Sequence, residues 1–228
     1  KANLTKPAQS ISQVASSFNP ILAAEGVLGQ ITYGKAGKIV MPKLNGVRGV
    51  NQGGVIMPRS LKKLRNDYTR SRFSMPELTD LDGELVVGDF DDEEVFVIST
   101  SGVGTIGGKP AVKWYVFDYY HPTASYLERL KMRDEAVALA KHPDVILVPW
   151  KIVYSDLELD TYAKECLALG YEGIVIRCPK AAYKTGRSTD KEQYFMRYCP
   201  WFKGEAEILA VQEGEINNNE SKVNELGF

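Results

Sequence analysis

The sequence has few cysteines, no long apolar run and almost no net charge. The three cysteines among its 228 residues, Cys166, Cys178 and Cys199, include no Cys-x-x-Cys pair. This pattern indicates neither a disulfide framework nor a zinc site, and it fits a reducing compartment. No stretch approaches about 18 uninterrupted apolar residues, so no membrane span is expected. The polar N-terminal segment shows no apolar core of a secretory signal.

What is present is ordinary globular composition. The chain is 44% hydrophobic and 25% charged, with a formal net charge of −1. Intrinsic disorder is excluded, because disordered chains combine low hydrophobicity with high net charge. The length fits one large domain, or one domain with a fragment of a second.

The near-zero net charge hides blocks of one sign. Residues 59–72 contain six basic residues and one acidic residue, while residues 77–94 contain nine acidic residues and no basic one. Residues 177–203 contain seven basic and two acidic residues, and residues 205–225 contain six acidic residues and one lysine. Such blocks indicate a polyanion-binding surface beside an acidic one. The alternative is that each block is an exposed helix or loop.

Short β-type runs dominate the middle of the chain. Strands are predicted at residues 39–41, 46–50, 54–57, 85–87, 114–117, 145–148 and 174–176. Helices are predicted at 60–68, 125–142 and 156–169, with Ser60 as the first N-cap and Gly170 as the last stop. Because strands outnumber helices and several are joined by tight turns, the pattern predicts an α+β fold of antiparallel sheets flanked by helices.

Four short motifs carry the residues best suited to chemistry. They are Lys43-Leu-Asn-Gly-Val-Arg48, Asp82-Gly-Glu84, Tyr115-Val-Phe117-Asp118 and Glu172-Gly-Ile-Val-Ile-Arg177, and a basic stretch follows them. Each motif alone is typical of a surface turn or a strand entry. Their shared order and spacing give them weight.

In this order the motifs resemble those of the covalent nucleotidyltransferases, which include polynucleotide ligases and mRNA capping enzymes. Residues 35–228 are most similar to the small ATP-dependent DNA ligases of bacteriophages. The resemblance implies an adenylation domain over residues 1–200. It implies that residues 201–228 begin a C-terminal OB-fold β-barrel, most of which is missing. The implied reaction moves AMP from ATP to a lysine, then to a 5′-phosphate, and a 3′-hydroxyl finally displaces it to close a nick.

The resemblance also implies roles for individual residues. Lys43 is the expected nucleophile, and such a lysine needs an accessible neutral form, which neighbouring cations or desolvation favour. The implied nucleotide contacts are Met41, Arg48, Glu84, Phe117, Arg197 and Lys203. Glu172 and Glu84 are the implied ligands of Mg²⁺ or Mn²⁺, since these cations prefer carboxylate oxygens. The implied nucleic-acid contacts are Arg59, Lys184 and Arg187.

Two positions depart from the family pattern. Asn45 stands where the family usually has Asp, so a hydrogen-bonding group remains but its charge is lost, which predicts slower adenylation. Cys199 stands where the last motif usually has its second lysine. Three interpretations stay open: Lys203 or Lys184 substitutes for it, the alignment is shifted by a few residues, or the step is impaired.

Several functional alternatives follow. The leading expectation is an ATP-dependent DNA ligase acting on nicked double-stranded DNA, in replication, repair or recombination. The alternatives are an RNA ligase or a GTP-dependent capping-type enzyme, or a catalytically impaired nucleic-acid-binding module. An NAD⁺-dependent ligase is not expected, because its extra N-terminal domain has no room. A monomer without membrane contact is expected in the cytoplasm, or in the host cytoplasm if a phage encodes it.

Overall fold

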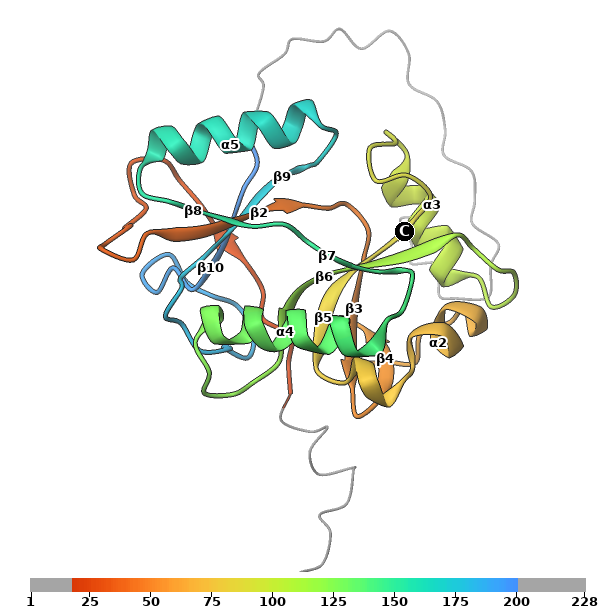
Figure 1. The fold of residues 1–228 in the computed structure, drawn as a ribbon. Helices are drawn as coiled ribbons and strands as arrows, with labels where there is room; N and C mark the ends of the chain where they lie inside the picture. Colours follow the sequence, from red (N-terminus) through yellow and green to blue (C-terminus); the bar gives the residue numbers. More distant parts are fainter. Residues whose placement is uncertain (1–17, 201–228) are drawn as a thin grey trace, which may run out of the picture.

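The computed structural model describes residues 18–200. Within this range the chain forms two five-stranded sheets, four α-helices and one 3-10 helix (Figure 1). The helices within residues 18–200 are too short or too polar to cross a bilayer. The expected OB-fold beginning at 201–228 and the expected nucleotide contact Lys203 lie outside the described residues.

The first sheet has the strand order β1-β10-β9-β2-β8. Its strands are β1 (Ala24–Glu25), β10 (Phe195–Tyr198), β9 (Gly173–Arg177), β2 (Lys38–Lys43) and β8 (Lys151–Val153). All neighbours are antiparallel except β1 and β10. Helix α5 (Asp156–Ala168) covers one face of this sheet, where it buries Leu159, Ala163 and Cys166 (Figure 1).

The second sheet has the order β4-β3-β5-β6-β7. Its strands are β4 (Val55–Pro58), β3 (Val47–Gln52), β5 (Leu81–Val87), β6 (Val112–Tyr119) and β7 (Val145–Leu147). Only β6 and β7 run parallel. Around it lie α2 (Asp67–Phe73), η1 (Pro76–Leu78), α3 (Val95–Gly104) and α4 (Tyr126–Ala140). Helix α4 packs on β6, and α3 packs on β5 (Figure 1).

An apolar layer joins the two sheets. Ile39 and Met41 of β2 point into it and meet Val86 of β5, together with Tyr126 and Leu130 of α4. Strand β2 passes directly into β3 through residues 44–46, so one short turn connects the sheets. The end of β2 is therefore fixed at the boundary between them.

A buried ionic cluster also ties the sheets together. Asp118 of β6 is fully buried and accepts a hydrogen bond of 2.8 Å from Arg129 Nε of α4. The same carboxylate contacts Arg177 at the end of β9. Arg129 donates further bonds of 2.8 and 2.9 Å to the carbonyls of Ala124 and Ala181. Because the cluster joins three elements, it holds the end of β6 in place.

Most predicted elements are confirmed. All seven predicted strands coincide with observed strands, and the two long helices begin at N-caps provided by Ser125 and Ser155. The predicted helix at 60–68 is wrong. Leu61 has a φ of 58°, which a right-handed helix does not allow, and α2 begins only after Asn66, whose side chain accepts a bond from Thr69 N at 2.8 Å. Helix α3 was not predicted.

Candidate active site

A cavity of about 570 Å³ lies at the boundary between the sheets, and both sheets contribute to its walls. Five basic residues line it: Lys43, Arg48, Arg59, Arg187 and Arg197. Glu84 is the one acidic residue of the lining. This excess of positive charge suits a polyphosphate ligand.

Lys43 and Glu172 meet at the ends of adjacent strands. Lys43 is the last residue of β2, and Glu172 immediately precedes β9, which pairs antiparallel with β2. The backbone N–H of Glu172 donates to the Lys43 carbonyl at 3.0 Å, and their side chains form an ion pair. The two side chains are 23% and 37% exposed, so both are accessible to a ligand. The expected nucleophile and the expected metal ligand are thus in contact.

Arg48 is held rigidly beside the cavity. Its Nε and Nη2 donate to the two oxygens of Asp82 at 2.5 and 2.6 Å. Asp82 also accepts a 2.8 Å bond from the hydroxyl of Tyr183. The Arg48 guanidinium carbon lies 4.7 Å from the centre of the Phe117 ring. This bidentate pair fixes where the guanidinium lies relative to the aromatic wall.

Glu84 is placed between the cations. It lies on β5 directly opposite Arg48 of β3. Burial raises the pKa of Glu84 to about 7; the charges of Arg48 and Lys43 oppose this shift, and those of Asp82 and Glu172 add to it. The carboxyl group is consequently protonated in a large share of molecules near neutral pH.

This shift predicts a pH dependence of stability. Between about pH 4.5 and pH 7 the native state holds the Glu84 proton more tightly than the unfolded state does, so the free energy of unfolding falls as pH rises. Glu84→Gln should remove this loss, and its stability advantage over wild type should grow by about 1–3 kcal/mol from pH 4.5 to pH 8. Urea unfolding of both proteins at the two pH values measures the difference. An equal difference in the free energy of unfolding at both pH values would contradict the raised pKa of Glu84.

One of the two candidate aromatics lines the cavity. Phe117 is part of its wall, and Tyr115 lies on the same side of β6 two residues earlier. Tyr115 instead packs edge-on against Phe90, with 6.4 Å between ring centres. Met41 departs from the expectation: it is fully buried, and its sulfur accepts a 3.2 Å bond from the Tyr126 hydroxyl. It lies on the same face of β2 as Lys43 but does not line the cavity, because Val86, Tyr126 and Leu130 pack around it in the core.

The remaining basic residues divide into two groups. Arg59, Arg187 and Arg197 line the cavity, as expected. Arg187 Nη1 donates to the Ala23 carbonyl at 2.6 Å, and the half-exposed Arg197 pairs with Glu25 at 2.9 Å. Lys184 departs from the expectation.

The Lys184 ammonium is held 2.5 Å from Glu192 Oε2. Lys184 does not line the cavity and is not brought together with the other predicted site residues.

Cys199 lies where the second cation of the last motif was expected. Gly173, next to Glu172, has a φ of +147°, and a Cβ built there would lie 3.0 Å from the sulfur of Cys199. Burial raises the pKa of the Cys199 thiol, and the nearby charge of Lys43 opposes this only in part. A neutral thiol therefore occupies this position, and it supplies no positive charge. Asn45 lies in the connecting turn and does not line the cavity.

Sequence reasoning missed some of the lining. Phe96 and Thr100 of α3 form part of the wall. Residues four apart lie on the same face of a helix. This spacing could have paired Phe96 with Thr100 only if α3 had been predicted as a helix. Gly46, predicted at the start of a strand after a turn, also lines the cavity. A Cβ on Gly46 would lie 2.4 Å from the Leu85 carbonyl oxygen, so the backbone approaches β5 more closely than a side chain permits.

Comparison with solved structures places this geometry in a family. The crystal structure of Chlorella virus DNA ligase–adenylate superposes with a TM-score of 0.69 at 27% sequence identity, over 79% of this chain and 68% of the viral chain. This likeness supports the ATP-dependent ligase nucleotidyltransferase family for the chain. No protein-family model and no curated protein sequence matches it.

Two further ligases share this fold. A Lig E DNA ligase aligns with a TM-score of 0.65 at 22% identity, over 86% of this chain and 74% of that one. The ATP-dependent DNA ligase of bacteriophage T7, in complex with ATP, aligns with a TM-score of 0.58 at 18% identity, over 80% of this chain and 68% of that one. At these identities the two structures bear on the fold alone.

Proposed function

We propose that the chain is the adenylation domain of an ATP-dependent DNA ligase that seals nicks between a 5′-phosphate and a 3′-hydroxyl. The observation that carries this proposal is the contact between Lys43 and Glu172 at a cavity lined by five basic residues. The likeness to a ligase whose structure is described as an adenylate supports it.

In the first step Lys43 is the nucleophile. Its ammonium loses a proton, for which the Glu172 carboxylate in contact with it is the nearest acceptor. The free electron pair of Nζ then forms a bond to the α-phosphorus of ATP, while the bond to the departing pyrophosphate breaks. Arg48 and the basic residues at the cavity mouth stabilise the negative charge that develops on the phosphates.

The cavity walls recognise the nucleoside. Phe117 offers an aromatic face on which adenine stacks, with the Arg48 guanidinium against the same ring. Glu84 is placed to accept a hydrogen bond from a ribose hydroxyl. The pKa of Glu84 lies near 7, so small changes around the carboxyl group decide whether it is ionised. The bound ribose and the surrounding cations favour the ionised form, which accepts such a bond.

The residues present fit a divalent cation held partly by phosphate. Among residues 18–200 no cluster of three or more His, Cys, Asp or Glu side chains forms a complete metal site. Mg²⁺ commonly uses one or two carboxylates and completes its shell with water and substrate phosphates. Glu84 in the cavity wall and Glu172 in contact with Lys43 would supply these carboxylates. Such an ion, Mg²⁺ or Mn²⁺, would neutralise phosphate charge.

The next two steps involve DNA. AMP passes from Lys43 to the 5′-phosphate at a nick, and the 3′-hydroxyl then attacks that phosphate and releases AMP. Arg59 and Arg187 lie at the cavity and are exposed, so they are placed to hold the 5′-phosphate and the neighbouring backbone.

Replacing Arg59 should separate these steps. Arg59→Ala is expected to lower the rate of AMP transfer to a nicked duplex at least tenfold more than it lowers self-adenylation. The reason is that Arg59 directly follows β4 of the second sheet, whereas Lys43 and Glu172 lie at the ends of strands of the first sheet. Single-turnover assays with preadenylated and unadenylated protein give the two rates. Equal losses in both would contradict the assignment.

One observation favours a second candidate function, a catalytically impaired nucleic-acid-binding module. The neutral Cys199 thiol beside Glu172, together with the pairing of Arg197 to Glu25, leaves the last motif with less free positive charge than the family pattern implies. Such a module would bind DNA in a salt-sensitive manner without forming a covalent nucleotide.

A joining assay tests the proposal against its alternatives. The protein is incubated with Mg²⁺, either ATP or GTP, and a labelled nicked duplex whose strands are DNA or RNA. Sealing of the DNA nick with ATP alone is expected. Preference for RNA strands would indicate an RNA ligase, and covalent GMP would indicate a capping-type enzyme. DNA binding without sealing or adenylation would favour the impaired module.

A further inference from the structure

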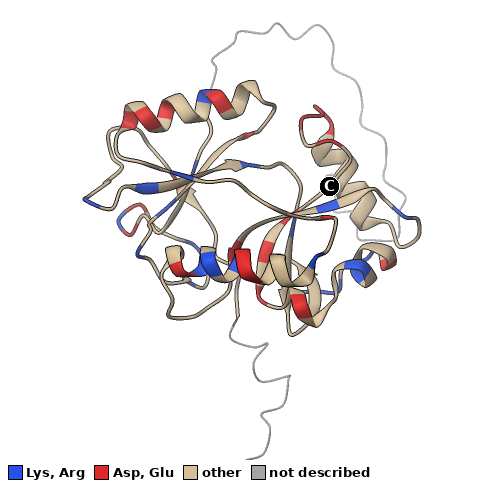
Figure 2. Cartoon of the chain, in the orientation of Figure 1, with Lys and Arg blue, Asp and Glu red and all other residues tan. Residues whose placement is uncertain are grey.

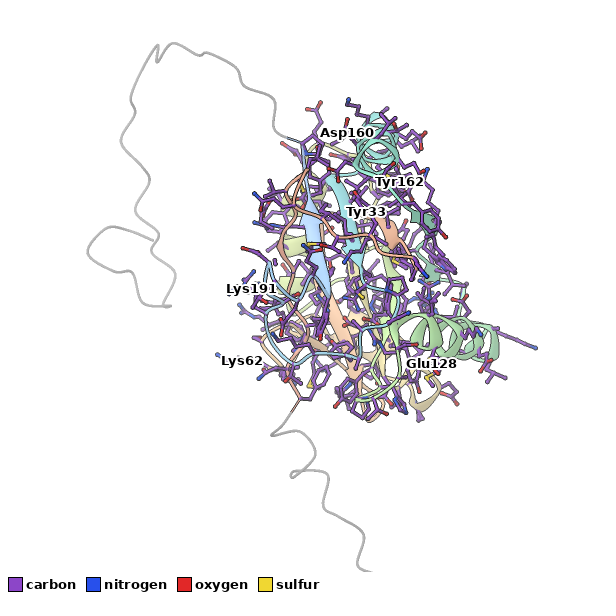
Figure 3. All side chains as sticks on the ribbon, turned by 90° about the vertical axis from the view of Figure 1, so that its left-hand side faces the viewer. Tyr33, Lys62, Glu128, Asp160, Tyr162 and Lys191 are labelled. Atoms are coloured by element: carbon purple, nitrogen blue, oxygen red, sulfur yellow. The ribbon has the colours of Figure 1, made fainter. Side chains whose placement is uncertain are left out.

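A second groove, of about 360 Å³, lies on the first sheet away from the active-site cavity. Its walls come from three segments, residues 32–38, 178–180 and 191–193, and it shares no lining residue with the active-site cavity. Two of its residues, Tyr33 and Lys191, lie on the side of the molecule drawn in Figure 3. Figure 2 shows basic positions on several loops at this end of the first sheet.

Lys38 forms the floor of the groove. It is the first residue of β2 and lies five residues before Lys43, so alternation along the strand directs the two side chains to opposite faces of the sheet. Lys38 is only 4% exposed. Its ammonium donates one hydrogen bond, to the Gln193 carbonyl at 3.2 Å, and within the described part of the chain it forms no ion pair. An ammonium has three donors, so two remain for a ligand.

The rim of the groove is basic as well. Lys35, Lys180 and Lys191 are exposed, and none forms an ion pair with another residue of the range 18–200. The one acidic residue in the lining, Glu192, is already engaged by Lys184 and by the hydroxyl of Thr189. The four lysines therefore leave the groove with an uncompensated positive charge.

The backbone beneath Lys38 is held in an unusual conformation. Gln193 has a φ of +51°, in the left-handed region that non-glycine residues rarely occupy. Its N–H donates to the Thr189 carbonyl at 2.9 Å, and its side chain bonds to the backbone of Gln30 and Thr32. Such a conformation persists where surrounding contacts fix it, and it is common at binding sites. The contacts aim the Gln193 carbonyl at Lys38.

We propose that this groove is a second anion site, which binds one phosphate group through Lys38 at the floor and Lys35, Lys180 and Lys191 at the rim. Burial lowers the pKa of Lys38, and a bound anion would offset that cost by keeping the ammonium charged. The phosphate comes either from the backbone of a nucleic acid or from free phosphate.

The loop between β9 and β10 favours the nucleic acid. Its residue Arg187 lines the active-site cavity, while Lys191 lines the groove. A duplex that lies along this loop reaches both. The anion site does not depend on adenylation, so it can be tested even in a chain that forms no covalent nucleotide.

The test compares two groove variants with a control that matches the charge of the rim variant. Lys35→Gln/Lys180→Gln/Lys191→Gln removes the rim, and Lys38→Met removes the floor. The matched control, Lys113→Gln/Lys131→Gln/Lys141→Gln, removes three lysines from outside the groove. For each protein, the melting temperature is measured in inorganic phosphate and in chloride at equal ionic strength. The affinity for a fluorescent intact duplex is measured as a function of salt.

The expected results distinguish the two sources. Phosphate should raise the melting temperature of wild type and of the control, and this rise should be clearly smaller in both groove variants, in which only the active-site cavity can still bind phosphate. If DNA supplies the phosphate, the rim variant should also bind the duplex at least tenfold more weakly than the control, with a shallower salt dependence. Loss of the phosphate effect alone would indicate free phosphate.

Unchanged phosphate stabilisation and unchanged DNA affinity in the rim variant, relative to the control, would overturn the proposal. The rim lysines are exposed, so this result does not depend on whether Lys38→Met folds. Lys38 would then only support the Gln193 carbonyl.

Discussion

Lys43→Ala is expected to abolish covalent attachment of AMP to the chain, with no adduct above background after prolonged incubation with ATP and Mg²⁺. The side chain that forms the phosphorus–nitrogen bond is absent, and no other lysine of the described residues is placed to replace it. Every other lysine of the range 18–200 lies outside the cavity lining. Intact-protein mass spectrometry of the variant and of wild type provides the measurement.

Lys43→Arg separates the nucleophile from the ion pair. A guanidinium keeps the positive charge beside Glu172 but stays protonated, so it cannot attack phosphorus. This variant should melt within a few degrees of wild type and still form no adduct. Lys131→Ala, on the exposed face of α4, is the matched control and should adenylate normally. Residual labelling of either Lys43 variant would show that the nucleophile lies elsewhere.

Asp118→Ala is expected to have the largest effect on stability, a loss of about 3–5 kcal/mol in the free energy of unfolding. The substitution leaves two buried guanidinium groups, Arg129 and Arg177, without their carboxylate. The larger part of this loss should come from Arg177, because its Nε and Nη1 already have no hydrogen-bond partner among the described residues. Urea unfolding measures the loss, and the soluble yield reports it if the variant does not fold.

A second ion pair of α4 provides the control. Asp134 pairs with Arg133 but is 46% exposed, so Asp134→Ala should cost less than about 1 kcal/mol. Burial alone raises the pKa of Asp118, but Arg177 and Arg129 together hold it below its ordinary value. Its contribution to stability is therefore present at neutral pH and is lost in acid. An Asp118→Ala variant as stable as Asp134→Ala would contradict the account of this cluster.

The order of the motifs predicted which residues meet, although the sequence could not show how. Lys43 and Glu172 are 129 residues apart, and they touch because β2 pairs with β9 in a register that sets Lys43 opposite Gly173. No local signal specifies that register. The resemblance to ligases indicated only that the two motifs belong to one site, and the pairing of β2 with β9 explains how they meet.

Helix α3 was missed because its residues favour a strand. Val95, Val97 and Ile98 are β-branched, and Ser and Gly follow them. Tertiary contacts decide the outcome: Val95, Ser99 and Val103 are buried against the second sheet, and the Ser99 hydroxyl accepts a 2.9 Å bond from Val87 N. The two cavity residues that α3 provides were therefore missed with it.

Ion pairs of the folded chain engage two of the expected basic site residues. The sequence marks Lys184 and Arg197 as free basic residues, yet the fold gives each a carboxylate, Glu192 and Glu25 respectively. Composition also gives no sign that Lys38 is buried, because lysine at the start of a strand is usually exposed. These features depend on contacts that form only in the folded chain.

Whether Lys43 accepts AMP is decided by mass spectrometry of the wild-type chain. The protein, shown to be folded and free of bound AMP, is incubated with Mg²⁺ and either ATP or GTP, and then digested for peptide mapping. One added AMP, from ATP only, is expected on the peptide that contains Lys43. A folded chain that gains no nucleotide, or that carries it on another residue, would contradict the account.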